Sequence, residues 1–313
     1  MSGKEDIIIT GQAIPSAMEA LEKKFNLLKL YEAPDMDAFL AANQHVRMCA
    51  STYKLRIDGA FMDKLPNLEL VANFGVGVDL IDLEAARARK IRVTNTPEVL
   101  NEAVAELAMA LMLSLCRRIV PADRHVRDGK WESAGYPLTG ELTGATVGIL
   151  GLGRIGKEIA KRCQAFGMQV VYHGRTEQKF QPYPYYASLV EMARDVDWLM
   201  CVVPGDTGTA GLVSREVLEA LGPEGNIVNV GRGSLIDEAA MLELLQNGGL
   251  GGAALDVFVK EPKMDPGFWA LDNVVLAPHQ GSATHKTRWQ MGDLMVRNLI
   301  AHSEGRPLIT PVV

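Results

Sequence analysis

The chain lacks the features that mark several large classes of protein. It has only four cysteines in 313 residues, and none shows the CxxC spacing of a metal or redox site, so we predict reduced thiols and no metal. The most apolar stretch, 99–115, contains Glu102 and Glu106 and is too short and polar to span a bilayer. The N-terminus lacks the pattern of a signal peptide. We therefore expect a cytoplasmic protein with no membrane partner.

An excess of positive charge is also absent. The formal net charge is -6, whereas binding to nucleic acid requires a basic face, so we expect no nucleic-acid partner. With 48% hydrophobic and 22% charged residues, the composition is typical of a globular protein. A length of 313 residues suggests two domains.

Short apolar runs alternate with helical patterns along the whole chain. The expected strands are 7–10, 46–50, 70–73, 92–95, 146–150, 169–172, 198–202, 226–229, 252–256 and 273–277. The expected helices are 16–25, 58–64, 82–89, 98–118, 155–166, 215–221, 237–246 and 286–303. Such alternation predicts parallel sheets covered by helices on both faces.

The predicted fold class is α/β, with two Rossmann-like, doubly wound parallel-sheet domains. We expect a dinucleotide-binding domain, 97–286, inserted into a flavodoxin-like substrate domain, 1–96 with 287–313. Thr96 followed by Pro97 resembles the start of a helix. The helix expected over 98–118 is apolar nearly all round, so we predict that it joins the domains and forms the interface of a homodimer.

A glycine fingerprint follows the strand expected at 146–150. Gly151-Leu152-Gly153-Arg154-Ile155-Gly156 ends this strand and opens a helix, which is the context that a dinucleotide-binding GxGxxG motif requires. Gly151 permits the turn, Gly153 admits a pyrophosphate and Gly156 lets the helix pack on the strand. The helix N-terminus favours phosphate.

The turn after the next strand lacks an acid. NAD-binding folds place a carboxylate there for the ribose hydroxyls, but 172–176 contains none. Arg175 offers a forked cation to a 2′-phosphate and Thr176 a hydroxyl, which favours NADPH over NADH, the weaker cofactor. The alternative is that Arg175 is a solvated loop charge.

Three polar residues follow three late strands: Arg232, Glu261 and His279. Ligands of open parallel sheets bind at the carboxyl ends of the strands, so these side chains can share one crevice. Reduction of a keto acid needs a cation for the substrate, a proton donor and a carboxylate that orients the donor, and these residues meet those needs. The alternative is structural: a loop hydrogen bond for His279, a cap from Glu261 and a surface ion pair for Arg232.

Six ordered motifs give the chain a resemblance to the D-isomer-specific 2-hydroxyacid dehydrogenase family. They are NFGVGVDLID (73–82), VTNTPEVL (93–100), VGILGLGRIG (147–156), CVVPGDTGTAGLV (201–213), NVGRGSLIDEAAMLELLQNGGLGGAALDVFVKEP (229–262) and LAPHQGSAT (276–284). The resemblance implies that Arg232, Glu261 and His279 form the catalytic triad. It also implies that the amides of Val76 and Gly77 hold the substrate carboxylate.

The resemblance further implies a set of cofactor contacts besides the fingerprint. They are Leu152, Arg154, Ile155, Val203, Pro204, Thr209, Asn229, Val230, Arg232, Asp256, His279 and Gly281. The turn at 172–176 is similar to that of NADPH-dependent glyoxylate/hydroxypyruvate reductases. An arylpyruvate (hydroxyphenylpyruvate-type) reductase is the alternative within the family, and a nucleotide-sensing corepressor-like binding protein is the alternative outside the enzymes. Two features depart from the family pattern: Gln280 beside the histidine, and the loop 131–139 with Tyr136.

Overall fold

The computed structural model describes residues 3–52, 55–205 and 208–313. The chain divides into two compact units: unit 1 is Met1–Leu100 with Ala283–Val313, and unit 2 is Asn101–Ser282. Each unit contains a parallel sheet, which confirms the predicted α/β class. The functional domains expected from the sequence, 1–96 with 287–313 and 97–286, differ from these bounds by a few residues and stay a prediction.

Unit 1 contains a five-stranded sheet in the order β2-β1-β3-β4-β5. All four strand pairs are parallel. This is the flavodoxin-like order. The strands are β1 (Glu5–Ile9), β2 (Phe25–Lys29), β3 (Met48–Ser51), β4 (Leu70–Asn73) and β5 (Arg92–Thr94). The helices are α1 (Pro15–Lys24), η1 (Leu30–Glu32), α2 (Met36–Ala42), α3 (Gly59–Asp63), α4 (Leu83–Ala88) and α11 (His285–Ser303).

Helices cover both faces of this sheet. One face packs on α2, α3 and α4 through a core that includes Leu40, Phe61 and Val71. Helix α11 contacts α1, β3 and β4 on the other side. Every residue of β3 and of β4 is buried, as expected for strands covered on both faces.

Unit 2 contains a seven-stranded parallel sheet in the order β12-β11-β10-β9-β6-β7-β8. Counted from β6, this is the doubly wound Rossmann order with one more strand at the edge. The strands are β6 (Thr146–Leu150), β7 (Gln169–His173), β8 (Tyr185–Tyr186), β9 (Trp198–Cys201), β10 (Asn226–Asn229), β11 (Gly252–Leu255) and β12 (Val274–Leu276). The helices are α5 (Asn101–Cys116), α6 (Ile119–Arg127), η2 (Lys130–Glu132), α7 (Arg154–Ala165), α8 (Leu189–Asp195), α9 (Arg215–Leu221), η3 (Gly233–Leu235), α10 (Glu238–Asn247) and η4 (Pro266–Phe268).

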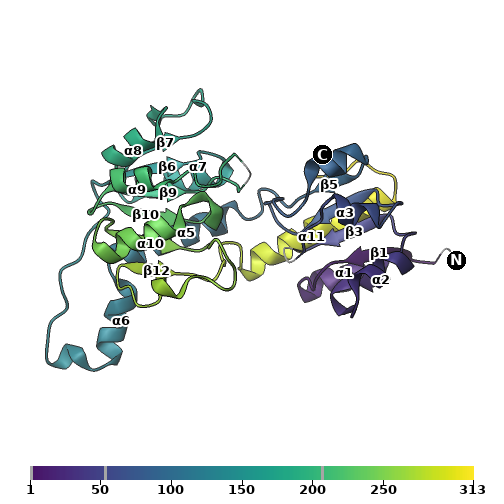
Figure 1. The fold of residues 1–313 in the computed structure, drawn as a ribbon, viewed down its shortest axis with the longest axis horizontal. Coiled ribbons are helices and arrows are strands. Elements are labelled where there is room, and N and C mark those ends of the chain that lie inside the picture. The colour runs from purple at the N-terminus through teal and green to yellow at the C-terminus, as the bar shows by residue number, and fades with distance from the viewer. Residues whose placement is uncertain (1–2, 53–54, 206–207) are drawn as a thin grey trace. The chain divides into compact units, whose positions relative to one another are not determined.

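The helices of unit 2 form two layers around the sheet (Figure 1). Helices α8, α9 and α10 lie together on one face, where Met192, Leu218 and Leu244 belong to one apolar core. Helices α5 and α7 pack against each other and against strands of the sheet. Only three residues, 151–153, connect the carboxyl end of β6 to the N-terminus of α7.

The predicted helix start at Thr96 is wrong. Helix α5 begins at Asn101, and Glu98 has a φ of 72°, which no α-helix allows. The Thr96 side chain is fully buried and its hydroxyl has no hydrogen-bond partner among the described residues, so it caps nothing. A cap acts through its side-chain oxygen on amides two or three residues on, but Thr96 precedes the start of α5 by five residues, and its N–H donates to Gly75 O at 3.0 Å.

Helix α5 is buried within its own unit, as its apolar sequence predicts. Eight of its side chains are buried, and it contacts α7, β10, β11 and β12. Helix α6, which the sequence did not predict, has no buried residue. Figure 1 shows α6 standing away from the sheet of unit 2. Within the described residues, no helix combines the length and apolarity needed to cross a bilayer.

The final residues of the chain are fixed to unit 1 by one buried amide. Asn298 is fully buried in α11, and its Oδ1 accepts from Ile309 N at 2.9 Å and Thr310 N at 3.2 Å. Its Nδ2 donates to Thr310 Oγ1 at 2.9 Å. Pro311 then forms an antiparallel bridge with Thr94 at the edge of the sheet.

We expect Asn298→Ala to lower the free energy of unfolding by about 2–3 kcal/mol, because two backbone N–H groups lose their acceptor. Asn26→Ala is the matched control, since the Asn26 amide is exposed and donates to the Asp6 side chain. Denaturant unfolding of both variants measures the difference. Equal stability of the two variants would contradict the role given to Asn298.

Candidate active site

The three residues expected to perform the chemistry follow three adjacent strands of unit 2. Arg232 follows β10, Glu261 follows β11 and His279 follows β12, and these strands are neighbours in the sheet. All three therefore lie at the carboxyl edge of one parallel sheet, where ligands of this fold bind.

Glu261 and His279 form a hydrogen-bonded pair. His279 Nδ1 lies 2.6 Å from Glu261 Oε2, and Phe258 N–H donates to Glu261 Oε1 at 2.9 Å. Burial opposes ionisation of Glu261, but the hydrogen bonds from His279 and Phe258, with the charges of His279 and Arg232, outweigh it and lower its pKa. A lowered pKa means that this carboxylate stabilises the fold above its ordinary titration range, and that the stabilisation is lost as the pH falls through the lowered pKa.

The loop that carries His279 is fastened to Asp256. His279 N–H donates to Asp256 O at 2.9 Å. The Asp256 carboxylate accepts from Gln280 N at 2.7 Å and from Gly281 N at 2.8 Å. Burial raises the pKa of Asp256, although both amides and the His279 charge oppose the rise. These three bonds hold His279 at a φ of 51°, a left-handed conformation that is costly for a residue with a Cβ.

Arg232 is joined to the same assembly through the backbone around it. Asn229 Nδ2 donates to Arg232 O at 2.9 Å, and Gly231 N donates to Asn229 Oδ1 at 3.0 Å, so Asn229 shapes the turn after β10. A Cβ at Gly233 would lie 1.9 Å from the carbonyl carbon of Phe258. The loop that carries Arg232 thus packs directly on the loop that carries Glu261.

The glycine fingerprint has the geometry of a phosphate cradle. Gly151 has a φ of 102°, and a Cβ there would meet Val203 Cγ1 at 2.5 Å. A Cβ at Gly156 would meet Gly151 O at 2.2 Å, so helix and turn are in backbone contact. A Cβ at Gly153 would meet nothing within 4 Å, which leaves open space in front of the α7 N-terminus. These features fit the pyrophosphate of a dinucleotide.

Side chains that the sequence did not single out tie the turn after β7 to this cradle. Gln178 Nε2 donates to Leu152 O at 2.7 Å, and Gln178 N donates to Tyr172 Oη at 2.7 Å. Tyr185 Oη donates to Gly174 O at 3.1 Å. Arg175 and Thr176 are exposed on the turn so anchored. They lie at the carboxyl end of the second strand, where this fold holds the adenosine ribose.

The remaining expected cofactor contacts surround the same edge of the sheet. Val203 and Pro204 follow β9, and Thr209 Oγ1 donates to Pro204 O at 2.8 Å. Val230 is buried just after β10. Arg154 and Ile155 form the first turn of α7. Their contacts with a cofactor, like that of Asp256, stay predictions.

Val76 and Gly77 belong to the loop after β4 in unit 1. The carbonyls of this loop are held by Asn73, at the end of β4, and by Asn95, just after β5. Neither asparagine was predicted to have a role, although each lies within a motif that carries the resemblance.

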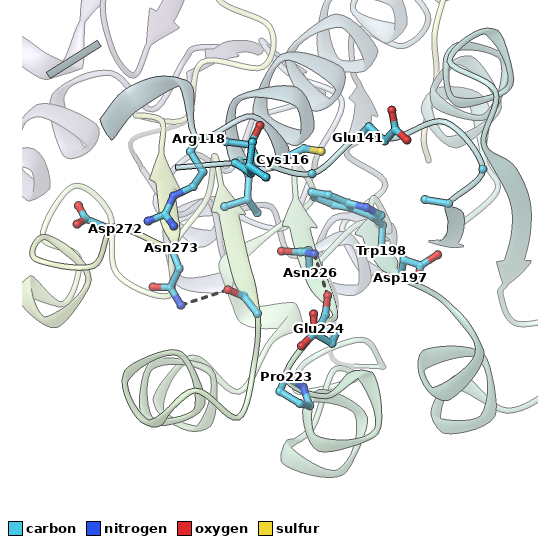
Figure 2. A pocket seen from close by; sticks show the side chains of 17 residues that line it. Cys116, Arg118, Glu141, Asp197, Trp198, Pro223, Glu224, Asn226, Asp272 and Asn273 are labelled. Carbon is cyan, nitrogen blue, oxygen red and sulfur yellow. Dashed lines mark hydrogen bonds between the residues drawn. The ribbon is translucent and has the colours of Figure 1, made fainter. Parts of the chain in front are cut away.

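A cavity of about 700 Å³ opens at the opposite edge of the unit 2 sheet (Figure 2). It is lined by residues at or just before the starts of strands, such as Asp197, Asn226 and Asn273, and by Arg118 and Glu141 from other segments. None of the three candidate catalytic residues lines it, so its position assigns it no part in their chemistry. The described residues contain no cluster of His, Cys, Asp and Glu that could hold a metal ion.

The four cysteines are free thiols, as predicted. Burial raises the pKa of Cys49 and of Cys163 to about 12. These thiols therefore stay protonated and serve as core residues.

Comparison with known proteins decides the family. Residues 109–281 match the NAD-binding domain of the D-isomer-specific 2-hydroxyacid dehydrogenases. The chain is 45% identical to glyoxylate/hydroxypyruvate reductase A of Arabidopsis thaliana over 294 residues, which are 94% of each chain. It belongs to the D-isomer-specific 2-hydroxyacid dehydrogenase family. It is therefore an oxidoreductase with an NAD(P)-binding domain, and a 2-keto acid reductase.

Two further relatives bear on specificity. The chain is 43% identical to hydroxyphenylpyruvate reductase of Plectranthus scutellarioides, over 94% of this chain and 95% of the relative. A solved structure of an NADPH-dependent glyoxylate/hydroxypyruvate reductase from Sinorhizobium meliloti, in complex with NADP and malonate, has a TM-score of 0.94 and 42% identity. That match covers 99% of this chain and 97% of the other.

Alanine substitutions at Gly156 and at Gly153 should affect different properties, the first stability and the second NADPH binding. Gly156→Ala forces a Cβ against Gly151 O, so we expect a lower melting temperature. Gly153→Ala places its methyl in open space, so stability should be unchanged while NADPH binding should weaken about tenfold, because the methyl would enter the space expected to hold the pyrophosphate. Thermal unfolding and NADPH fluorescence titration measure the two effects. Normal NADPH affinity in Gly153→Ala would place the phosphates elsewhere.

Proposed function

We propose that the chain reduces glyoxylate and hydroxypyruvate to D-2-hydroxy acids with NADPH. The observation that carries the proposal is the 2.6 Å contact between His279 Nδ1 and Glu261 Oε2, at the sheet edge that also carries Arg232 and the glycine cradle. A carboxylate in this position keeps one imidazole nitrogen engaged and leaves Nε2 to act on a substrate.

The residues divide the chemistry among them. A dinucleotide held by the glycine cradle would supply the hydride for the carbonyl carbon. His279 donates its Nε2 proton to the carbonyl oxygen, and Glu261 stabilises the imidazolium before this transfer. Arg232 neutralises negative charge on the oxygen and the substrate carboxylate through its forked donors. The amides of Val76 and Gly77 bind that carboxylate.

The relatives support the choice of substrate. Reductases of glyoxylate and hydroxypyruvate stand at 45% identity in Arabidopsis and at 42% in Sinorhizobium. Hydroxyphenylpyruvate is the second candidate, because a reductase of that aryl keto acid stands at 43%. Both substrates present the same keto acid group and differ in the side chain beyond it.

A panel of keto acids tests the proposed activity. NADPH oxidation should have the highest kcat/KM with glyoxylate or hydroxypyruvate, ahead of pyruvate and hydroxyphenylpyruvate. His279→Ala should lower kcat by about 10²–10⁴, the usual contribution of a positioned general acid, whereas NADPH affinity should barely change because the other expected cofactor contacts remain. His302→Ala is the control, since His302 is a histidine of unit 1 bound to Glu69. Highest activity with hydroxyphenylpyruvate would establish the second candidate instead.

Cofactor preference depends on Arg175 in this proposal. The 2′-phosphate of NADPH is a charged acceptor for the guanidinium, and a hydrogen bond to a charged group changes affinity about 10- to 150-fold. Arg175→Ala should therefore weaken NADPH by that factor without creating strong use of NADH. Arg194→Ala, an exposed arginine of α8, is the control. The measurement is kcat/KM with both cofactors; equal use of NADPH and NADH by the wild type would refute the preference.

We also propose a homodimer. Helix α5 is buried in its own unit, so the support for a homodimer comes from the segment that follows α5 in the chain. Helix α6 has no buried residue, and its neighbours Trp131 and Leu138 are exposed by 66% and 100%. A nine-residue helix without a packed face is unstable in water, so a second copy is the expected cover.

Sedimentation at micromolar concentration should show a dimer for the wild type. Trp131→Ser should shift it toward monomer because an apolar contact is removed. Trp269→Ser is matched, since Trp269 is exposed by 68% in the same unit but lies outside this segment. A monomeric wild type would refute the dimer.

A further inference from the structure

Three successive carbonyls of the loop 75–77 are held by side chains and backbone of unit 1. Asn73 Nδ2 donates to Gly75 O at 3.1 Å and to Gly77 O at 2.9 Å. Asn95 Nδ2 donates to Val76 O at 2.9 Å. Thr96 N adds a bond to Gly75 O at 3.0 Å. The loop is thus fastened entirely through its acceptors.

Because the peptide bond is planar, the bonds that fix these carbonyls also fix the direction of the N–H groups that follow them. The C=O of one residue and the N–H of the next lie in one plane and point in opposite directions. Fixing Gly75 O therefore fixes Val76 N–H, and fixing Val76 O fixes Gly77 N–H. Within the described part of the chain, neither of these N–H groups has an acceptor. Val76 N–H is therefore directed away from Asn73, and Gly77 N–H is directed away from Asn95.

The asparagines themselves have little freedom. Asn73 is only 7% exposed, and both bonds from its amide nitrogen go to the loop. Asn95 O accepts from Thr310 Oγ1 at 2.6 Å, and Asn95 N donates to Thr310 O at 3.3 Å. Thr310 is held in turn by the buried Asn298. The loop is backed by a chain of contacts that reaches α11.

We propose that Asn73 and Asn95 are positioning residues for the 2-keto acid. They orient the peptide planes so that the N–H groups of Val76 and Gly77 face the substrate carboxylate before it arrives. This inference rests on the proposed function, in which those amides bind the carboxylate. Donors that are already oriented bind an anion without the cost of reorganisation, which is the advantage such a clamp provides.

Alanine variants of both asparagines test the proposal. Asn73→Ala and Asn95→Ala should each raise the KM for glyoxylate about tenfold or more, the scale of one hydrogen bond to a charged group. The inhibition constant of malonate, an unreactive dicarboxylate, should rise in parallel. The Kd of NADPH should stay unchanged, and kcat should fall less than KM rises. Asn95→Asp, of the same shape but without the donor, should behave like Asn95→Ala or worse.

Asn67→Ala is the matched control. Asn67 also donates its amide to a backbone carbonyl, Gln44 O at 2.9 Å, but it lies before β4 instead of after it. Its KM should equal that of the wild type. Melting temperatures show whether each variant is folded; if the buried Asn73 variant does not fold, the half-buried Asn95 decides.

The possible failures are distinguishable. If the wild type reduces glyoxylate but folded Asn95→Ala keeps KM and the malonate constant within twofold, the positioning role is refuted and the proposed function stands. If the wild type reduces none of the keto acids with NADPH, the proposed function fails and this proposal fails with it.

Discussion

The burial of Asp256 beneath the loop 279–281 is the constraint on which the candidate catalytic site depends. A carboxylate that is 2% exposed must have hydrogen-bond partners, and it finds them in the amides of Gln280 and Gly281. These bonds compensate for the left-handed backbone of His279. His279 forms a hydrogen bond with Glu261, and the N–H of Phe258 orients the Glu261 carboxylate. The backbone of Phe258 in turn packs on Gly233, the residue after Arg232. One buried acid therefore sets the geometry of three loops.

The site could be predicted from the sequence because of where its residues stand along the chain. Each candidate side chain follows an apolar run that is recognisable as a strand, and adjacent parallel strands bring such positions together without further information. The glycine cradle was equally accessible, because Gly151 and Gly156 are required by local backbone contacts that lie within one short motif. The position of Arg232, Glu261 and His279 after three strands thus follows from local patterns, whereas their assignment as a triad came from the family resemblance.

Other features were not accessible, for a physical reason that they share. Thr96 has the local signature of a helix cap, yet its N–H is bound by Gly75, a residue far away in the sequence. The roles of Asn73, Asn95 and Gln178 likewise depend on which backbone carbonyl each amide reaches after folding. Helix α6 has no buried residue although Ile119, Val120 and Val126 give it an apolar side, and Pro121 within its nine residues is a local signal against a helix. Tertiary hydrogen bonds leave little trace in the local sequence pattern.

The two units hold their loops by opposite choices of side chain, and the choice follows from what each loop must present. In unit 2, Asp256 offers only acceptors, so it draws backbone N–H groups inward and leaves the His279 imidazole to act outward. In unit 1, Asn73 and Asn95 use their amide donors, so they draw carbonyls inward and leave N–H groups outward. An aspartate at position 73 would reverse the loop's polarity, since a carboxylate has no donor for Gly75 O or Gly77 O. In this chain, an amide at 73 and at 95 leaves the N–H groups of the loop 75–77 outward, and a carboxylate at 256 holds the loop that presents His279.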